Sequence, residues 1–169
     1  ESRGIKNGES IADHIYGAYL LGLLYLPEYK PNFSDTDYSE YCKERILNMI
    51  LLHDIGESYT GDIVSTQKTD KEKFEERQIT RAIFMSSTYS EVSNLTFYKE
   101  IWDEFIKNST MNARVAHEID KIENLVQILM YRKAGRNISD FEQWKGYLRS
   151  RMVTTLGKNI YEFIENSLL

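Results

Sequence analysis

Helix breakers are scarce in this chain. Its 169 residues include only 2 prolines and 9 glycines, so few positions force the backbone to turn. A chain of this length suits one domain and can bury a sizeable core. We therefore expect an all-α protein of about seven helices, folded as a single domain over residues 1–169.

The charge and the cysteine content exclude several classes of protein. The formal net charge of −5 does not provide the basic face that a nucleic-acid polymer requires. The single cysteine, Cys42, cannot form an internal disulfide, which favours a reducing compartment. The apolar run 18–26 spans about nine residues, far fewer than the roughly 20 that cross a bilayer. We expect a cytoplasmic protein that binds neither a nucleic-acid polymer nor a membrane.

Periodic apolar residues predict where the helices run. Ser10 can cap the first helix and Pro27 ends it. Gly135 suits the end of the longest helix, and Ser139 with Glu142 has the spacing of a capping box for the next one. The segment 56–70 is expected to be irregular. The expected helices are 11–26, 38–55, 71–87 (with Phe74, Ile79, Ile83 and Phe84 on its inner side), 91–107, 112–134, 139–152 and 158–167.

Four polar residues interrupt otherwise apolar helix surfaces. His53 and Asp54 end the most apolar segment, His14 lies near the apolar side of the first helix, and Asp120 lies between isoleucines in the longest one. Buried polar groups need partners, and imidazole nitrogens and carboxylate oxygens are good ligands for a divalent cation. Together they predict a four-ligand metal site built from three helices.

Each of these residues also has a simpler interpretation. A helix that merely ends at His53 and Asp54 would leave both side chains facing water. A lone histidine such as His14 is more often a hydrogen-bonded core residue. Asp120 could form an ordinary salt bridge, although its neighbour Lys121 is expected to point elsewhere.

The order and context of these residues resemble the HD-domain superfamily of metal-dependent phosphohydrolases, in its 5′-deoxynucleotidase-like branch. The resemblance runs from about residue 3 to about residue 134, with C-terminal helices expected over 139–168. Four short motifs carry it, in order and at compatible spacing: Glu9-Ser-Ile-Ala-Asp-His14, His53-Asp-Ile-Gly-Glu57 with Gly61-Asp-Ile63, Trp102-Asp-Glu-Phe105, and Asp120-Lys-Ile-Glu123.

The resemblance implies an HD-domain helical bundle that holds a divalent metal ion. Its ligands would be His14, His53, Asp54 and Asp120. The identity of the metal stays open among Mn, Co, Fe, Ni, Zn and Mg.

The resemblance also implies catalytic and substrate-binding residues. Glu57 and Asp62 match the family's acidic pair beside the metal. Glu57 would position or activate a water molecule, and Asp62 would do the same or supply a proton to the leaving oxygen. Arg3 would contact the substrate. The third histidine, His117, is not used by the family pattern and is expected behind the ligands or at the surface.

The activity that the resemblance implies is hydrolysis of a (deoxy)nucleoside 5′-monophosphate to a nucleoside and phosphate, by a homodimeric enzyme. Two alternatives stay open. The chain could hydrolyse another phosphorylated nucleotide, such as a dNTP or a guanosine polyphosphate. It could also be a catalytically silent domain that binds a metal or a partner.

Overall fold

The computed structural model describes residues 10–33, 38–60, 69–85 and 95–168, and within these ranges it contains eight helices and no strand. The predicted all-α class is confirmed. The helix beyond the predicted seven is α3, a single turn inside the segment that we expected to be irregular. The helices are α1 (Ile11–Tyr25), α2 (Lys43–Leu52), α3 (Glu57–Thr60), α4 (Asp70–Phe84), α5 (Leu95–Lys107), α6 (Met111–Lys133), α7 (Phe141–Ser150) and α8 (Thr155–Leu168).

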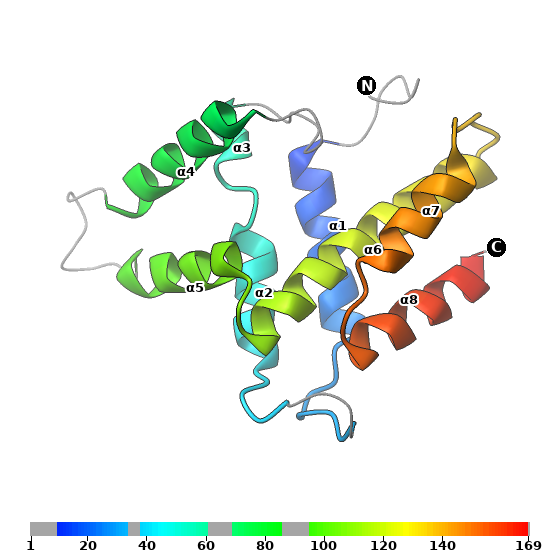
Figure 1. The fold of residues 1–169 in the computed structure, drawn as a ribbon, viewed down its shortest axis with the longest axis horizontal. Coiled ribbons are helices and arrows are strands. Elements are labelled where there is room, and N and C mark those ends of the chain that lie inside the picture. The colour runs from blue at the N-terminus through cyan, green and yellow to red at the C-terminus, as the bar shows by residue number, and fades with distance from the viewer. Residues whose placement is uncertain (1–9, 34–37, 61–68, 86–94, 169) are drawn as a thin grey trace.

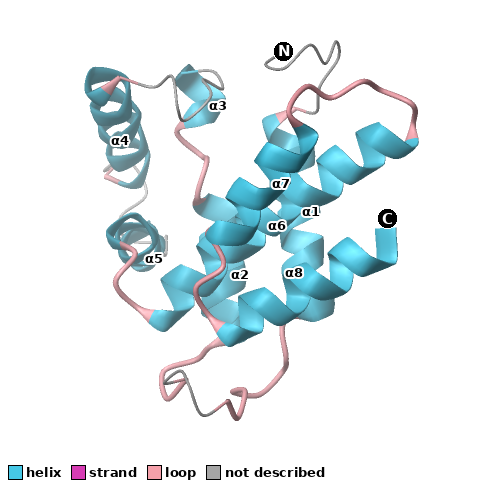
Figure 2. Ribbon diagram, turned by 45° about the vertical axis from the view of Figure 1, so that its right-hand side comes forward, coloured by secondary structure: helices cyan, strands magenta, loops and turns pink. Residues whose placement is uncertain are grey.

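The longest helix, α6, is the central element of the fold. It packs against α1, α2, α5, α7 and α8. Helices α3, α4 and α5 lie on one side of it, and α7 and α8 lie on the other (Figure 1); the turned view shows α4 and α5 set apart from α7 and α8 (Figure 2). Buried apolar residues of α1, α2, α5, α6, α7 and α8 form one continuous core, so a side chain on α6 can meet residues from distant parts of the sequence.

Two helix ends follow the sequence signals closely. At the start of α1, the Ser10 hydroxyl accepts a hydrogen bond from the Asp13 N–H, and the Asp13 carboxylate accepts one from the Ser10 N–H. This reciprocal capping box fixes the turn that carries His14. At the end of α6, Gly135 adopts a φ of +76°, a conformation that glycine tolerates without strain.

The second helix is shorter than predicted at both ends. It begins at Lys43 and ends at Leu52, whereas the prediction ran over 38–55. Tyr38 is instead buried before the helix, where its hydroxyl accepts a hydrogen bond from the Leu156 N–H at 3.1 Å. This tertiary contact with α8 overrides the local helical pattern. At the other end, a turn after Leu52 places His53 and Asp54 outside the regular helix.

The inner side of α4 differs from the prediction at Phe74. That side chain is 60% exposed, whereas Thr80 and Phe84 are buried. Phe84 packs against Trp102 of α5, and Thr80 and Glu76 lie so close to Gly56 that a β-carbon there would collide with both. Phe74 is two residues, about 200°, from Glu76, and therefore lies on the opposite face of the helix. Residues 86–94, which include the predicted end of this helix at 87 and the predicted start of the next at 91, lie outside the described residues.

The C-terminal helices begin at other residues than predicted. The expected capping box of Ser139 and Glu142 does not form, because Asp140, with a φ of +58°, precedes α7 and its side chain makes no capping hydrogen bond. Helix α8 starts at Thr155, three residues before the predicted position. The reason is that Thr154 accepts a hydrogen bond from the Gly157 N–H at 2.9 Å, which caps the helix early.

Within the described residues, every helix is too short or too polar to cross a membrane.

Candidate metal centre

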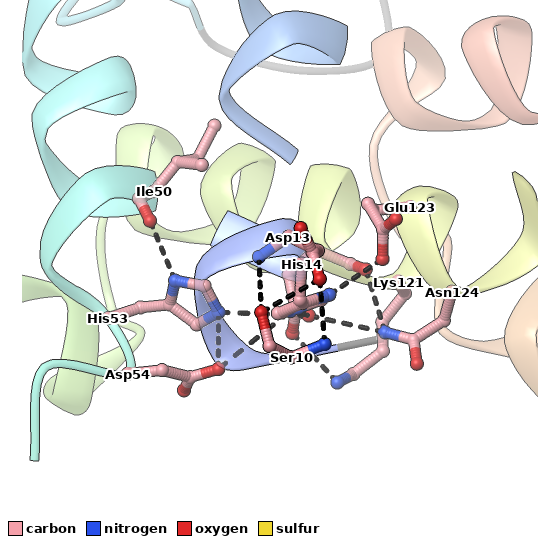
Figure 3. Close-up of polar contacts among 10 residues, drawn as sticks. Ser10, Asp13, His14, Ile50, His53, Asp54, Lys121, Glu123 and Asn124 are labelled. Atoms are coloured by element: carbon pink, nitrogen blue, oxygen red, sulfur yellow. Dashed lines mark hydrogen bonds and ion pairs between the residues drawn. The ribbon is translucent and has the colours of Figure 1, made fainter. Parts of the chain in front are cut away.

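Three separate elements bring the predicted ligands together. His14 comes from the first turn of α1, His53 and Asp54 from the turn after α2, and Asp120 from the middle of α6. Figure 3 shows the two imidazole rings and the Asp54 carboxylate converging beside α6. Because the helices that carry them pack on one another, the site is anchored in the core.

The distances between the donor atoms are those of a shared centre. Nε2 of His14 lies 3.1 Å from Oδ1 of Asp120 and 3.8 Å from Oδ2 of Asp54. Nε2 of His53 lies 3.0 Å from Oδ2 of Asp54 and 3.9 Å from Oδ1 of Asp120. Ligands about 2.1 Å from one cation lie about 3 Å apart when adjacent and about 4 Å apart when opposite. Among the described residues, His14, His53 and Asp120 form a group whose donor atoms all lie within 4.8 Å of one another.

The contacts of His53 indicate what the centre can hold. Its Nδ1–H donates to the Ile50 carbonyl at 2.7 Å, which turns Nε2 toward the carboxylates. Burial would lower the pKa of His53, but Asp54 and Asp120 outweigh it and raise the pKa. That Nε2 atom is buried and has no hydrogen-bond partner, although two carboxylates lie near it. A ring nitrogen that faces carboxylate oxygens needs a positive charge there, supplied either by a proton on the ring or by a cation. A divalent cation fits this donor set of two imidazoles and two carboxylates.

His14 lies between two buried carboxylates of α6. Its Nε2 faces Asp120, and its Nδ1 lies 2.6 Å from Oε2 of Glu123. Burial alone would lower the pKa of His14, but the hydrogen bonds to Asp120 and Glu123 outweigh it and raise the pKa to about 11. The acidic surroundings therefore hold a proton on this ring when no cation is present.

Lys121 lies beside the same centre, contrary to the expectation that it points elsewhere. Its Nζ is 2.7 Å from Oδ2 of Asp120. The flexible lysine stem bends back to its neighbour, which helical spacing alone does not predict. Burial would raise the pKa of Asp120, but Lys121, with His14 and His53, lowers it instead. Asn124, one turn later, donates to the Asp120 carbonyl at 2.9 Å.

Of the remaining predicted site residues, Glu57 alone lies in the part of the chain that the structure describes. Glu57 begins α3, and its backbone N–H donates to the Asp54 carbonyl at 3.0 Å. It therefore stands one turn beyond the His53–Asp54 pair. Asp62 and Arg3 lie outside the described residues.

The third histidine supports the centre from behind. His117 stacks on the ring of Phe105, with centroids 3.8 Å apart, and Phe105 also contacts the ring of His53. The Nε2–H of His117 donates to the Phe105 carbonyl at 3.0 Å, and burial lowers its pKa. His117 is thus a neutral packing residue that fixes the aromatic wall beside His53, which agrees with a position behind the ligands.

Sequence reasoning gave no role to two residues that the geometry places at the site, Lys121 and Glu123. Glu123 is 1% exposed and lies three residues after Asp120. An acidic residue between the apolar positions of a central helix is the same signal that identified Asp120. A further acid in the Trp102–Phe105 motif, Glu104, has a structural role, since it binds Arg45 of α2 and the Thr110 hydroxyl, each at 2.6 Å.

Comparisons with characterised proteins give relatives that cover most of the chain. The 5′-deoxynucleotidase HDDC2 of Dictyostelium discoideum is 29% identical over 158 residues, which are 93% of this chain and 78% of that protein. The 5′-deoxynucleotidase hdd1 of Schizosaccharomyces pombe is 31% identical over 152 residues, which are 86% of this chain and 70% of that protein.

Solved structures share the fold. A conserved hypothetical protein from Pyrococcus furiosus superposes with a TM-score of 0.71 and 25% identity, over 97% of this chain and 87% of that one. A predicted metal-dependent phosphohydrolase from Magnetospirillum magnetotacticum has a TM-score of 0.61 over 95% of this chain and 79% of that one; at 19% identity it supports the fold alone.

The family follows from the match to a whole-domain sequence model. The model described as HD domain matches residues 1–162, nearly the entire chain. The match includes every histidine and aspartate of the centre described above. The chain belongs to the HD-domain family.

Proposed function

We propose that this protein is a metal-dependent phosphohydrolase that removes the phosphate from (deoxy)nucleoside 5′-monophosphates. The observation that carries the proposal is the convergence of donor atoms at His53, whose buried Nε2 lies 3.0 Å from Oδ2 of Asp54 and 3.9 Å from Oδ1 of Asp120 without making a hydrogen bond. Relatives named 5′-deoxynucleotidase, at 29% and 31% identity over most of the chain, support the substrate class.

We assign the cation to His14, His53, Asp54 and Asp120. Two imidazole nitrogens and two carboxylate oxygens suit Mn, Fe, Co, Ni or Zn better than Mg, which prefers oxygen ligands and water. A bound divalent cation would lower the pKa of a water molecule and offset the charge of the phosphoryl oxygens.

Lys121 balances the charge of this centre. Asp54, Asp120 and Glu123 contribute three negative charges, of which a divalent cation cancels two. The ammonium group of Lys121, 2.7 Å from Asp120 and 29% exposed, cancels the third. Lys121 and the cation thus reduce the repulsion that a dianionic phosphate meets at the ligands, and Lys121 is close enough to the solvent to contact it.

The acidic residues after His53 would handle the protons. Hydrolysis joins a water oxygen to phosphorus and breaks the bond between phosphorus and the 5′ oxygen of the sugar. Glu57, one turn beyond Asp54, would accept the proton of the attacking water. Asp62 would assist or supply a proton to the leaving 5′ oxygen, and Arg3 would bind the substrate, as the family resemblance implies.

The test is phosphate release from a panel of dNMPs, NMPs, dNTPs and a guanosine polyphosphate, each with Mn, Co, Mg or Zn. We expect release from monophosphates, and its loss in Glu57→Ala. Metal content of the purified protein identifies the bound ion. Release from the tri- or polyphosphates alone would replace the proposed substrate class. No release from any substrate by metal-loaded protein would favour a silent binding domain.

We further propose that residues 1–169 form one HD domain that assembles into a homodimer in the cytoplasm. The continuous core that links α1 with α8 supports a single domain. Helix α1 exposes large apolar side chains, among them Tyr16 (65%) and Leu24 (71%), which a second copy would cover. A single unfolding transition and light scattering of the wild type and of Leu24→Glu test the two statements.

A further inference from the structure

Glu123 is a buried acid whose partner is a ligand of the candidate metal centre. It is 1% exposed, and its Oε2 lies 2.6 Å from Nδ1 of His14. The bond joins α6 to α1 across 109 residues of sequence. A carboxylate removed from water needs a donor of this kind, so the contact fixes the orientation of the His14 ring.

The two histidines are held in the same way by different partners. The Nδ1–H of His53 donates to the Ile50 carbonyl, and that of His14 donates to the Glu123 carboxylate. In both rings this leaves Nε2 facing the centre. A carboxylate also makes the opposite ring nitrogen a stronger electron donor than a carbonyl does.

Gly17 provides the space for this arrangement. It lies three residues after His14 on α1, on the side that faces α6. A β-carbon at this position would lie 2.9 Å from Oε1 and 3.2 Å from Cγ of Glu123. A glycine inside a helix is otherwise unfavourable, so its presence here fits the close approach of the carboxylate.

We propose that Glu123 is a positioning residue, which orients His14 and strengthens its Nε2 as a ligand, and that Gly17 is required for this contact. The inference rests on the metal centre of the proposed function. It does not depend on which phosphate ester is hydrolysed.

The first experiment measures the affinity of the purified, metal-free protein for Mn²⁺ and Co²⁺ by calorimetry. We expect Glu123→Leu to bind about 10–100-fold more weakly than the wild type, as for other residues that hold a metal-ligating histidine. Glu123→Gln keeps a hydrogen-bond acceptor and should lose less. The visible spectrum of bound Co²⁺ should change in Glu123→Leu, because the His14 ring is no longer held.

Glu118 is the matched control. It is also a buried glutamate of α6, 2% exposed, but it binds the start of α8. Glu118→Gln should lower the melting temperature without changing the affinity for either ion. A folded Glu123→Leu protein with wild-type affinity and an unchanged Co²⁺ spectrum would overturn the proposal.

A second pair of variants tests the contact from the other side. Gly17→Ala should displace the Glu123 carboxylate and weaken ion binding in the same direction as Glu123→Gln. Gly146→Ala on α7, where a β-carbon meets nothing within 4 Å, should leave ion binding unchanged. Wild-type affinity in Gly17→Ala would contradict the role of Gly17.

The two proposals can fail separately. Weaker ion binding in the Glu123 variants together with no phosphate release from any nucleotide would support the positioning role and overturn the proposed activity. Phosphate release from monophosphates, together with unchanged ion binding in the variants, would do the reverse. A wild-type protein that binds none of Mn²⁺, Co²⁺, Zn²⁺ or Mg²⁺ would overturn both.

Discussion

Helix α6 buries carboxylates in two places, and their partners differ. Glu118 accepts hydrogen bonds from the N–H groups of Val153 and Thr154 at 2.6 and 2.7 Å, and from the Thr154 hydroxyl at 2.5 Å. It therefore caps the start of α8, where backbone N–H groups lack partners and favour a negative charge. Burial raises the pKa of Glu118, and these hydrogen bonds oppose that rise.

Asp120 and Glu123, less than two turns further on, face imidazole rings instead of backbone donors. The His14 ring lies within hydrogen-bond distance of both carboxylates, and Nε2 of His53 makes no hydrogen bond. The comparison separates two kinds of buried acid on one helix. An acid that backbone donors satisfy has a structural role, whereas acids grouped around two imidazole rings form a candidate site for a cation.

The largest effect on activity is expected from removing the His53 imidazole. His53→Ala should reduce phosphate release to background, and should weaken ion binding beyond the about 10–100-fold expected of a residue behind the ligands. The measurement is the rate of release from a dNMP at saturating Mn²⁺. Glu118→Gln, assayed well below its melting temperature, should retain activity. Loss of activity in both variants would mean that Glu118 is not a purely structural acid.

Glu118, the buried acid with a structural role, should affect the stability of the fold rather than the activity. Glu118→Ala leaves the N–H groups of Val153 and Thr154, just before α8, and the buried Thr154 hydroxyl without their acceptor, and should lower the free energy of unfolding by about 3 kcal/mol. Urea unfolding monitored by circular dichroism measures it. If the loss were below about 0.5 kcal/mol, Glu118 would not be the structural member of the pair.

Together with His53, whose pKa is also raised in the folded state, His14 should determine the pH dependence of the metal-free protein. The His14 pKa of about 11 in the folded state exceeds the value of about 6.5 in an unfolded chain. The folded state therefore keeps a proton that the unfolded state loses. The stabilising effect of this proton is complete below about pH 6.5 and is lost as the pH rises toward the folded pKa, by at most about 1.4 kcal/mol per pH unit for each histidine.

Urea unfolding of chelator-treated protein between about pH 6.5 and about pH 9 measures this slope. Protein saturated with Mn²⁺ is the control, because the cation replaces the proton on Nε2 of His14 and should flatten the slope. Stability that is constant or rises with pH in the metal-free protein would contradict the assignment.

A smaller effect is expected at Lys121. Lys121→Met removes a charge that is 29% exposed beside Asp120, and should lower kcat/KM for a monophosphate by about 10-fold, chiefly through KM. Inhibition by inorganic phosphate should weaken in parallel. Lys133→Met, an exposed change at the end of the same helix, is the control. Equal effects of both changes would mean that Lys121 acts only through the net charge of the protein and does not bind phosphate.

Local patterns predicted much of the fold and of the site. Helix class, the Ser10 cap and the Gly135 end follow from short-range rules, and His14, His53 and Asp120 stood out as polar residues on apolar helix faces. The start of α2 did not follow, because Tyr38 is held by α8, more than a hundred residues away. Lys121 was misplaced because a long flexible side chain is not directed by helical spacing. Such contacts exist only once the helices have packed.

The bond between His14 and Glu123 also has a consequence for how the protein is made. At about 5–20 residues per second, His14 is added to the chain roughly 5–20 s before Glu123, which follows 109 residues later. During that interval the first helix has no α6 to pack against, and the chain cannot gather its ligands. A cation that binds His14 and Asp120 together can therefore be held by both only after α6 has been made.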